Sequence, residues 1–127
     1  MRLLLDTHVL LWAMEGSPRL GRRGRDLLTD PANEVWASAA SMWEIAIKAA
    51  LDKLRLVRPL ESMCAAIVES GMGTLDVTMR HAALVGSVRL PHSDPFDRLL
   101  LAQCEVETLR LVSADRQLAD HPAVIGL

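Results

Sequence analysis

The chain has 127 residues, of which 50% are hydrophobic and only 3% aromatic, and its formal net charge is −2. This length fits one domain, expected to span residues 1–127, and the aliphatic content is enough for a single core. The nearly balanced charge excludes a uniformly basic surface that would coat a nucleic acid, although a local basic patch stays compatible with it.

Localisation follows from two features of the apolar segments. No stretch approaches the roughly 20 apolar residues that a membrane helix needs. The first apolar run is short and ends at an acid, Asp6, which is unlike a signal peptide. We therefore expect a cytoplasmic protein that has no membrane partner.

Apolar runs and chain breakers predict strands that alternate with helices along the whole chain. We expect strands at residues 2–5, 34–37, 74–77, 109–112 and 123–125. Helices are expected at residues 7–13, 18–28, 39–51, 60–69, 79–88 and 96–106, with a loop at 90–95 and a helical turn at 115–119. This alternation favours an α/β fold, a three-layer α/β/α sandwich around a mostly parallel central sheet.

Cysteines and histidines give no zinc signal. Cys64 and Cys104 lack the Cys-x-x-Cys or Cys/His spacing of zinc sites, so we expect both to be small core residues. The four histidines also lack ligand spacing and are interpreted as surface or packing residues: His8, His81, His92 and His121. Two of them, His8 and His92, flank the acids described next.

Four acids stand beside apolar runs in separate segments. Asp6 and Asp115 follow predicted strands, Asp97 opens a predicted helix, and Glu44 lies two turns into another. Each has an ordinary explanation by itself, namely a helix cap, a helix-dipole contact or, for Glu44, an ion pair with Lys48. Because ligand sites in open α/β sheets lie at the carboxyl ends of the strands, we expect the four acids to share one site. A hard divalent cation is the simplest ligand for such a cluster of oxygens.

The segments that carry these acids resemble the PIN-domain ribonucleases, and in particular the VapC-type toxins of type II toxin–antitoxin systems. The resemblance covers essentially the whole chain in the right order and rests on four motifs: LLLDTH at residues 3–8, SMWEI at 41–45, DPFDRLLLAQ at 94–103 and LVSAD at 111–115. One departure is Ser113, where the family often has threonine, but a hydroxyl is retained. Asp94 is an additional acid that reads equally well as a helix cap.

The resemblance implies a Mg²⁺- or Mn²⁺-dependent endoribonuclease with four catalytic acids, Asp6, Glu44, Asp97 and Asp115. Within this set, the metal ligands would be Asp6, Asp97 and Asp115, and Glu44 would place a second metal or the attacking water. Thr7 would hydrogen-bond carboxylates or waters near the metal, and so would Ser113. The resemblance also implies an RNA substrate, a cognate antitoxin and a homodimer.

Candidate RNA contacts are basic residues. Lys48 and Arg98 each neighbour a proposed site acid, so we expect them to contact substrate phosphates. The densest basic cluster is either a second phosphate contact or an ordinary solvated helix face: Arg19, Arg22, Arg23 and Arg25. Apolar surface for an antitoxin or a second copy is expected from Leu10, Leu11, Trp12 and residues 60–68, unless these form ordinary core.

Three alternatives stay open at this level. The same acids suit a DNA nuclease, because no reader of the RNA 2′-hydroxyl is identifiable. They also suit a non-catalytic protein-binding module of the same fold. A phosphatase of the haloacid-dehalogenase type is less consistent, because that family expects a second aspartate two residues after the first, where this chain has His8.

Overall fold

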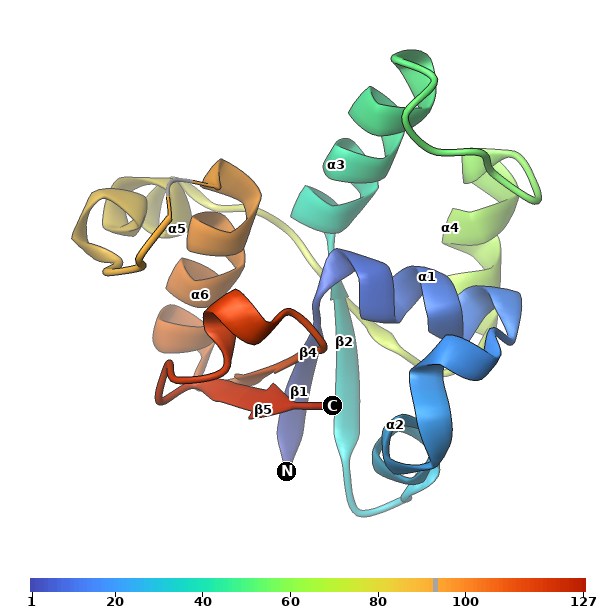
Figure 1. Cartoon of the computed structure of the whole chain (residues 1–127), viewed down its shortest axis with the longest axis horizontal. Helices are drawn as coiled ribbons and strands as arrows, with labels where there is room; N and C mark the ends of the chain where they lie inside the picture. Colours follow the sequence, from blue (N-terminus) through green and yellow to red (C-terminus); the bar gives the residue numbers. More distant parts are fainter. Residues whose placement is uncertain (93) are drawn as a thin grey trace.

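Figure 1 shows the computed structural model of the chain, which describes residues 1–92 and 94–127. A five-stranded sheet runs through the centre in the order β3-β2-β1-β4-β5, and all four neighbouring pairs are parallel. The strands are β1 (Arg2–Leu5), β2 (Glu34–Ser38), β3 (Gly73–Leu75), β4 (Arg110–Ser113) and β5 (Val124–Gly126). The predicted α/β fold with a parallel sheet is confirmed.

Helices connect the strands in nearly the predicted places. The α-helices are α1 (Thr7–Glu15), α2 (Gly21–Thr29), α3 (Ala39–Ala50), α4 (Leu60–Glu69), α5 (Met79–Leu84) and α6 (Pro95–Glu107), and the 3₁₀ turns are η1 (Pro18–Leu20), η2 (Val85–Ser87) and η3 (Arg116–Leu118). The single helices expected at 18–28 and 79–88 each divide into a 3₁₀ turn and an α-helix. Gly21 separates η1 from α2 with a φ of 71°, which a glycine adopts without strain. In the predicted loop 90–95, Ser93 lies outside the described residues.

The sheet is covered on both faces, as its buried side chains show. Along β1, Leu3 and Leu5 pack into one apolar cluster with residues of α1, α3 and α4, whereas Leu4 packs into a second cluster with α6. Successive side chains of a strand point to opposite faces, so a strand of three buried leucines feeds both layers. This arrangement confirms the three-layer sandwich.

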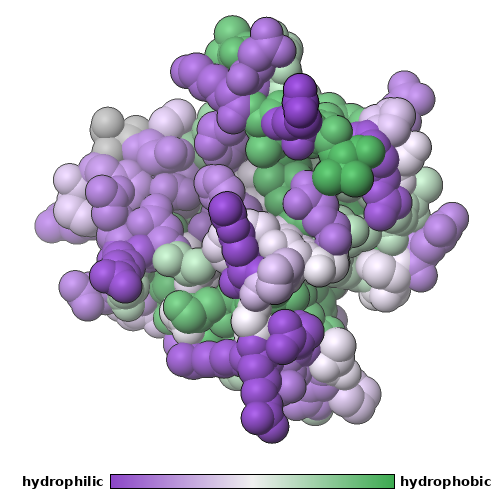
Figure 2. Space-filling view, turned by 45° about the vertical axis from the view of Figure 1, so that its right-hand side comes forward, coloured by the Kyte–Doolittle hydropathy of each residue, from purple (hydrophilic) through white to green (hydrophobic). Residues whose placement is uncertain are grey.

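Part of the apolar surface expected on the first helix is core instead. Leu10 is fully buried and Leu11 is 4% exposed, because both face the sheet. On α4, Met63 and Ile67 are also buried, whereas Val68 is 63% exposed. Figure 2 shows the molecule with the right-hand side of Figure 1 turned forward, and on this face apolar residues gather in patches between hydrophilic ones.

The two cysteines differ in environment. Cys104 lies in the α6 core, where burial raises the pKa of its thiol to about 12. Cys64 is exposed on α4, so the prediction that both are core residues was wrong for Cys64.

Within residues 1–92 and 94–127, no helix combines the length and apolarity required to cross a bilayer.

Helix starts stand directly at the carboxyl ends of two central strands. β1 is followed at once by Asp6, whose side chain caps α1, and β2 ends in Ser38, whose hydroxyl accepts from the Ala40 amide and caps α3. α6 approaches the same edge with its amino end, where Asp94 accepts hydrogen bonds from the amides of Phe96 and Asp97. The starts of α1, α3 and α6 therefore lie at one edge of the sheet, and α1 and α3 reach it through tight connections from β1 and β2.

Candidate metal centre

The four acids singled out in the sequence come from four elements that meet at this edge. Asp6 links β1 to α1, Glu44 lies in α3, Asp97 lies in the first turn of α6, and Asp115 precedes η3 just after β4. The first three are buried, with 6%, 5% and 9% of their surface exposed, and Asp115 is exposed. Buried carboxylates require hydrogen bonds, ion pairs or a cation, and the structure supplies several such partners.

Asp6 is held by two hydrogen bonds. The Ser113 hydroxyl donates to its Oδ2 at 2.6 Å, and the Thr7 amide donates to its Oδ1 at 2.7 Å. The pKa of Asp6 lies above its ordinary value because burial disfavours the charge, although these hydrogen bonds and nearby His8 act in the opposite direction. The Ser113 hydroxyl also accepts from the Asp115 amide at 3.0 Å, so one side chain fixes two acids.

Glu44 is held from α1 and from its own helix. The Thr7 hydroxyl donates to its Oε1 at 2.7 Å, and the Lys48 ammonium lies 2.5 Å from its Oε2. The hydrogen bond to Glu44 raises the pKa of Lys48, so this amine stays charged. The simple i,i+4 ion pair considered in the sequence is therefore present. Together with the hydrogen bond from Thr7, this ion pair fixes the Glu44 carboxylate between α1 and α3, at one side of the acidic cluster.

Asp97 has a strongly raised pKa. Its pKa is raised to about 7, first by burial and then by the negative charges of Asp6, Asp94, Asp115 and Glu44, in that order. Charges that shift the pKa of a carboxyl lie near it, so these acids are neighbours of Asp97. The four predicted acids therefore share one small region.

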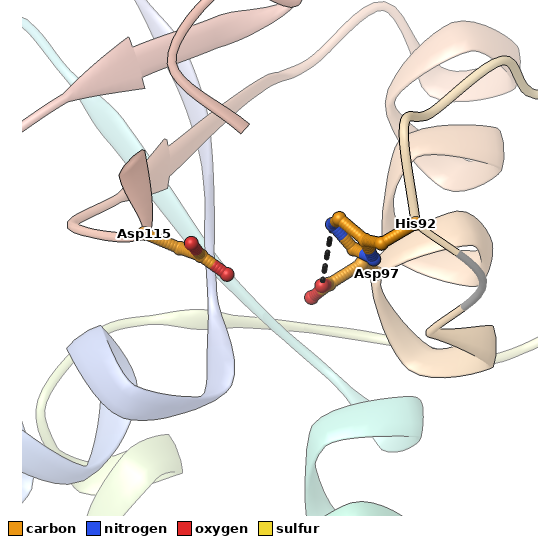
Figure 3. Close-up of side chains that lie close together, drawn as sticks. All are labelled: His92, Asp97 and Asp115. Carbon is orange, nitrogen blue, oxygen red and sulfur yellow. Dashed lines mark ion pairs between the residues drawn. The ribbon is translucent and has the colours of Figure 1, made fainter. Parts of the chain in front are cut away.

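His92 belongs to this region as well. Its Nε2 lies 3.7 Å from Asp97 Oδ2, and ligand atoms of His92, Asp97 and Asp115 lie within 4.8 Å of one another. Figure 3 shows the imidazole beside Asp97 on the α6 side, with Asp115 facing them from the end of β4. The sequence interpretation of His92 as a surface or packing residue missed this placement. The available signal was only its position two residues before the helix cap Asp94.

The imidazole is better suited to orienting a carboxylate than to binding a metal. His92 Nδ1 accepts from the Asp94 amide at 3.3 Å, which leaves the proton of a neutral ring on Nε2. A protonated nitrogen does not coordinate a cation. Among the described residues Nε2 has no hydrogen-bond partner, and it stands near Asp97 at a distance slightly too long for one.

The basic residues of the sequence analysis are divided between two ends of the molecule. Arg98 donates to the carbonyl oxygens of Val88 at 2.6 Å and His92 at 3.1 Å, so its guanidinium holds the loop before α6. Its role as an RNA contact stays a prediction. Arg22 and Arg23 line a depression with Met1, at the amino end of the sheet and opposite the acids (Figure 1). This placement favours a solvated helix face for the arginine cluster.

The donor set fits a hard divalent cation. Asp6, Asp97 and Asp115 offer carboxylate oxygens, which Mg²⁺ and Mn²⁺ accept. Burial raises the pKa of Asp97 most, and the negative charges around it raise it further, so a cation would offset both the desolvation and the repulsion. The Ser113 hydroxyl holds Asp6 through a hydrogen bond, as partners of metal ligands commonly do, and the Thr7 hydroxyl holds Glu44 beside them.

Comparisons with known proteins agree with this fold. The chain resembles a chain in VapBC2 from Rickettsia felis bound to a DNA fragment from their promoter, with 17% identity, a TM-score of 0.69 and coverage of 100% and 98% of the two chains. A toxin-antitoxin complex from Klebsiella pneumoniae gives 16% identity, a TM-score of 0.66 and coverage of 97% and 95%. FitAcB from Neisseria gonorrhoeae gives 20% identity, a TM-score of 0.61 and coverage of 98% of this chain and 96% of that chain. No curated protein sequence matches the chain.

The family assignment rests on the sequence. The profile of the PIN domain matches residues 3–124, which includes β2, β3 and β4 in full, most of β1, the first residue of β5, and all four acids. At identities this low, the solved structures establish the shared fold alone. Because the profile spans nearly the entire chain, the protein belongs to the PIN domain family.

Proposed function

We propose that the protein is a Mg²⁺- or Mn²⁺-dependent endoribonuclease and the toxin of a toxin–antitoxin pair. The observation that supports it best is the convergence of Asp6, Glu44, Asp97 and Asp115, with the pKa of Asp97 raised to about 7 by burial and the other acids. PIN domains are generally nucleases, and the similar folds include chains from toxin–antitoxin complexes.

Asp6, Asp97 and Asp115 would hold the cation, which would neutralise the phosphate and acidify the attacking water. Ser113 holds Asp6 and the amide of Asp115 in place, so the two carboxylates approach the centre from one wall. The opposite wall is α6 with Asp97, and His92 would restrain that carboxylate. Glu44 accepts from Thr7 and Lys48 through both oxygens, which suits a group that orients water.

Lys48 is our candidate for direct phosphate contact. Its side chain is about one-third exposed, and its charge is secured by Glu44. Arg98 would contribute through the loop that it holds, in addition to any phosphate contact of its own.

The test is cleavage of a total RNA pool with and without Mn²⁺, followed by mapping of the product ends. We expect wild-type protein to cut at defined positions only with metal. We expect Asp97→Asn to lower the rate by about 10²-fold or more, because one charged ligand is lost while the side-chain shape is kept.

Arg110→Gln is the matched control, because this exposed residue on β4 lies at the strand end away from the acids. Undiminished cleavage by folded Asp97→Asn would reject the metal role of that residue. Metal-dependent cleavage of DNA but not RNA would establish the DNA nuclease alternative, and no cleavage of either would favour a binding module.

We also propose a cognate antitoxin and a homodimer. Chains of similar fold occur in complexes described as toxin–antitoxin complexes. This chain has an apolar pocket of about 190 Å³ between α3, α4 and β3 that exposes Val68 beside buried Ile67. Such a pocket suits an apolar side chain of a partner.

A further inference from the structure

A second pocket adjoins the acidic cluster on its α1 side. It has a volume of about 150 Å³ and is formed by α1, α3 and the connector after α3. Its walls are aliphatic, and its polar groups include two amines and an imidazole. The lining residues are Thr7, His8, Leu11, Ile45, Lys48, Lys53 and Leu54.

The chain is folded back to place Lys53 in this pocket. α3 ends at Ala50, and Asp52 then adopts a φ of 55°, a left-handed conformation that aspartate tolerates better than most residues. The reversal lets the Lys53 amide donate to the Lys48 carbonyl at 2.9 Å. Two lysines that are five residues apart therefore line one small cavity.

The pocket has the chemistry of an anion site. No acid lines it, and in residues 1–92 and 94–127 no carboxylate lies within ion-pair distance of Lys53. Ligand pockets for drug-sized molecules measure roughly 300–1,000 Å³, so this cavity is too small for a nucleoside. A single phosphate group suits both its size and its charge.

Hydrogen bonds connect the pocket to the acids. Thr7 and Lys48 line it, and both bond Glu44, one to each carboxylate oxygen. His8, a third lining residue, is close enough to Asp6 to lower the pKa of that carboxyl. An anion in the pocket would therefore stand next to a phosphate held at the acidic cluster. A nucleic-acid strand supplies such neighbouring phosphates.

We propose that the pocket of His8, Lys48 and Lys53 binds the RNA phosphate that neighbours the cleaved one. This inference rests on the proposed nuclease function and adds a subsite to it. The subsite fixes the register of the strand without reading its sequence, because phosphate contacts position a nucleic acid and base contacts specify it.

The test uses a short RNA that contains a mapped cleavage position. The linkages on either side of that position are replaced one at a time by uncharged methylphosphonate, and kcat/KM is measured with Mn²⁺. For wild-type protein, we expect one of these substitutions to lower kcat/KM by about tenfold, as for loss of a hydrogen bond to a charged group. We expect Lys53→Gln to lower kcat/KM on the unmodified RNA by a similar factor and to be insensitive to that same linkage.

Arg55→Gln is the matched control. It removes one positive charge from the same connector, and Arg55 is exposed like Lys53 but does not line the pocket. We expect this variant to keep the wild-type sensitivity to the neutral linkage. As a second readout, the salt dependence of RNA binding should fall by about 0.7 in log–log slope for Lys53→Gln, the value for one phosphate on a single strand.

Several results would overturn the subsite. Equal losses of kcat/KM in Lys53→Gln and Arg55→Gln would show that only the overall positive charge of the connector matters, and not a phosphate subsite. Full methylphosphonate sensitivity in Lys53→Gln would place that phosphate elsewhere. Weakened antitoxin binding with unchanged RNA cleavage would assign the pocket to the antitoxin. In each case wild-type protein still cleaves RNA, so the nuclease proposal survives, whereas absence of any metal-dependent cleavage would reject both.

Discussion

At the scale of single residues, Asp97 combines burial with negative neighbours. Its position in the first turn of α6 is favourable for a charged carboxylate, because the helix dipole stabilises anions there. Burial and the charges of Asp6, Asp94, Asp115 and Glu44 outweigh that benefit and raise its pKa to about 7. A residue with such strained electrostatics is typical of a functional site.

The raised pKa makes the stability of metal-free protein depend on pH. The ordinary value for Asp97 is 3.8, so between that value and about 7 the unfolded chain loses the proton while the folded chain keeps it. The stabilising contribution is complete below the lower value and is lost as pH rises through the upper one. In chelator, we therefore expect a lower free energy of unfolding at about pH 8 than at about pH 5.

Urea denaturation of wild type and Asp97→Asn at both pH values measures this effect. The variant should show a smaller decrease, because its amide does not titrate, and Mn²⁺ should reduce the decrease in wild type only. The pKa of Asp6 is also raised, so a residual slope is expected in the variant. Identical slopes in the two proteins would contradict the electrostatic account of Asp97.

At the scale of elements, the start of α6 serves both packing and the site. Asp94 caps the helix through the amides of Phe96 and Asp97, and Pro95 occupies the first turn, where no amide is needed. The buried Gln103 farther along α6 accepts from the Ser38 hydroxyl at 2.6 Å, which ties α6 to the cap of α3. The two helices that carry Glu44 and Asp97 are thereby held at a fixed separation.

Two substitutions of Asp94 separate its cap from its charge. Asp94→Ala removes the acceptor and should lower the free energy of unfolding by about 1 kcal/mol relative to Asp94→Asn, which keeps a carbonyl acceptor. Both variants relieve the same repulsion on Asp97, so the difference between them isolates the cap. Urea denaturation in chelator provides the measurement.

Activity of the same pair addresses the role of Asp94 in the site. If Asp94 acts only as a cap, Asp94→Asn should keep metal-dependent cleavage near the wild-type rate. A large loss in Asp94→Asn at unchanged stability would instead show that the carboxylate charge serves the metal centre. Equal stability of the two variants would contradict the cap.

At the scale of the whole molecule, several large apolar side chains are exposed beyond what packing explains. Among the described residues these include Met79 at 90%, Val57 at 79%, Val68 at 63% and Trp43 at 58%. Trp43 contacts Phe96 of α6 edge to face, with 5.2 Å between ring centroids, so it also borders the helices of the site. Exposed apolar surface of this kind is common where partners bind.

We expect the purified protein to be a homodimer. Light scattering after size-exclusion chromatography should give twice the 14.0 kDa mass of one chain over a range of loading concentrations. A monomer mass throughout that range would contradict the dimer and would leave the exposed apolar residues to the antitoxin.

Local signals in the amino-acid sequence predict the order and type of nearly every element. Strand and helix signals are local. The run Leu3–Leu5 has no polar residue, which predicts a strand buried on both faces. Ser38 and Asp94 have the short polar side chains that cap helices, and so predict where helices begin. Asp6 and Asp115 are conspicuous for the same reason, since each is a carboxylate that follows an apolar strand, and Asp97 opens a helix. The alternation of strands and helices predicts that these three lie at one edge, whereas Glu44, two turns into its helix, needs the further expectation that its helix face approaches that edge.

The tertiary structure alone decided how side chains far apart in the chain meet. His92 reaches Asp97 through an irregular loop, which has no periodicity from which a direction could be inferred. Lys53 enters a pocket because the chain reverses at Asp52, and Arg98 bonds backbone carbonyls that no sequence pattern reveals. Burial on a helix also depends on the layer that covers it, which is why Leu10 and Leu11 are core and Cys64 is exposed. Local sequence fixes backbone conformation, whereas these contacts depend on packing between elements.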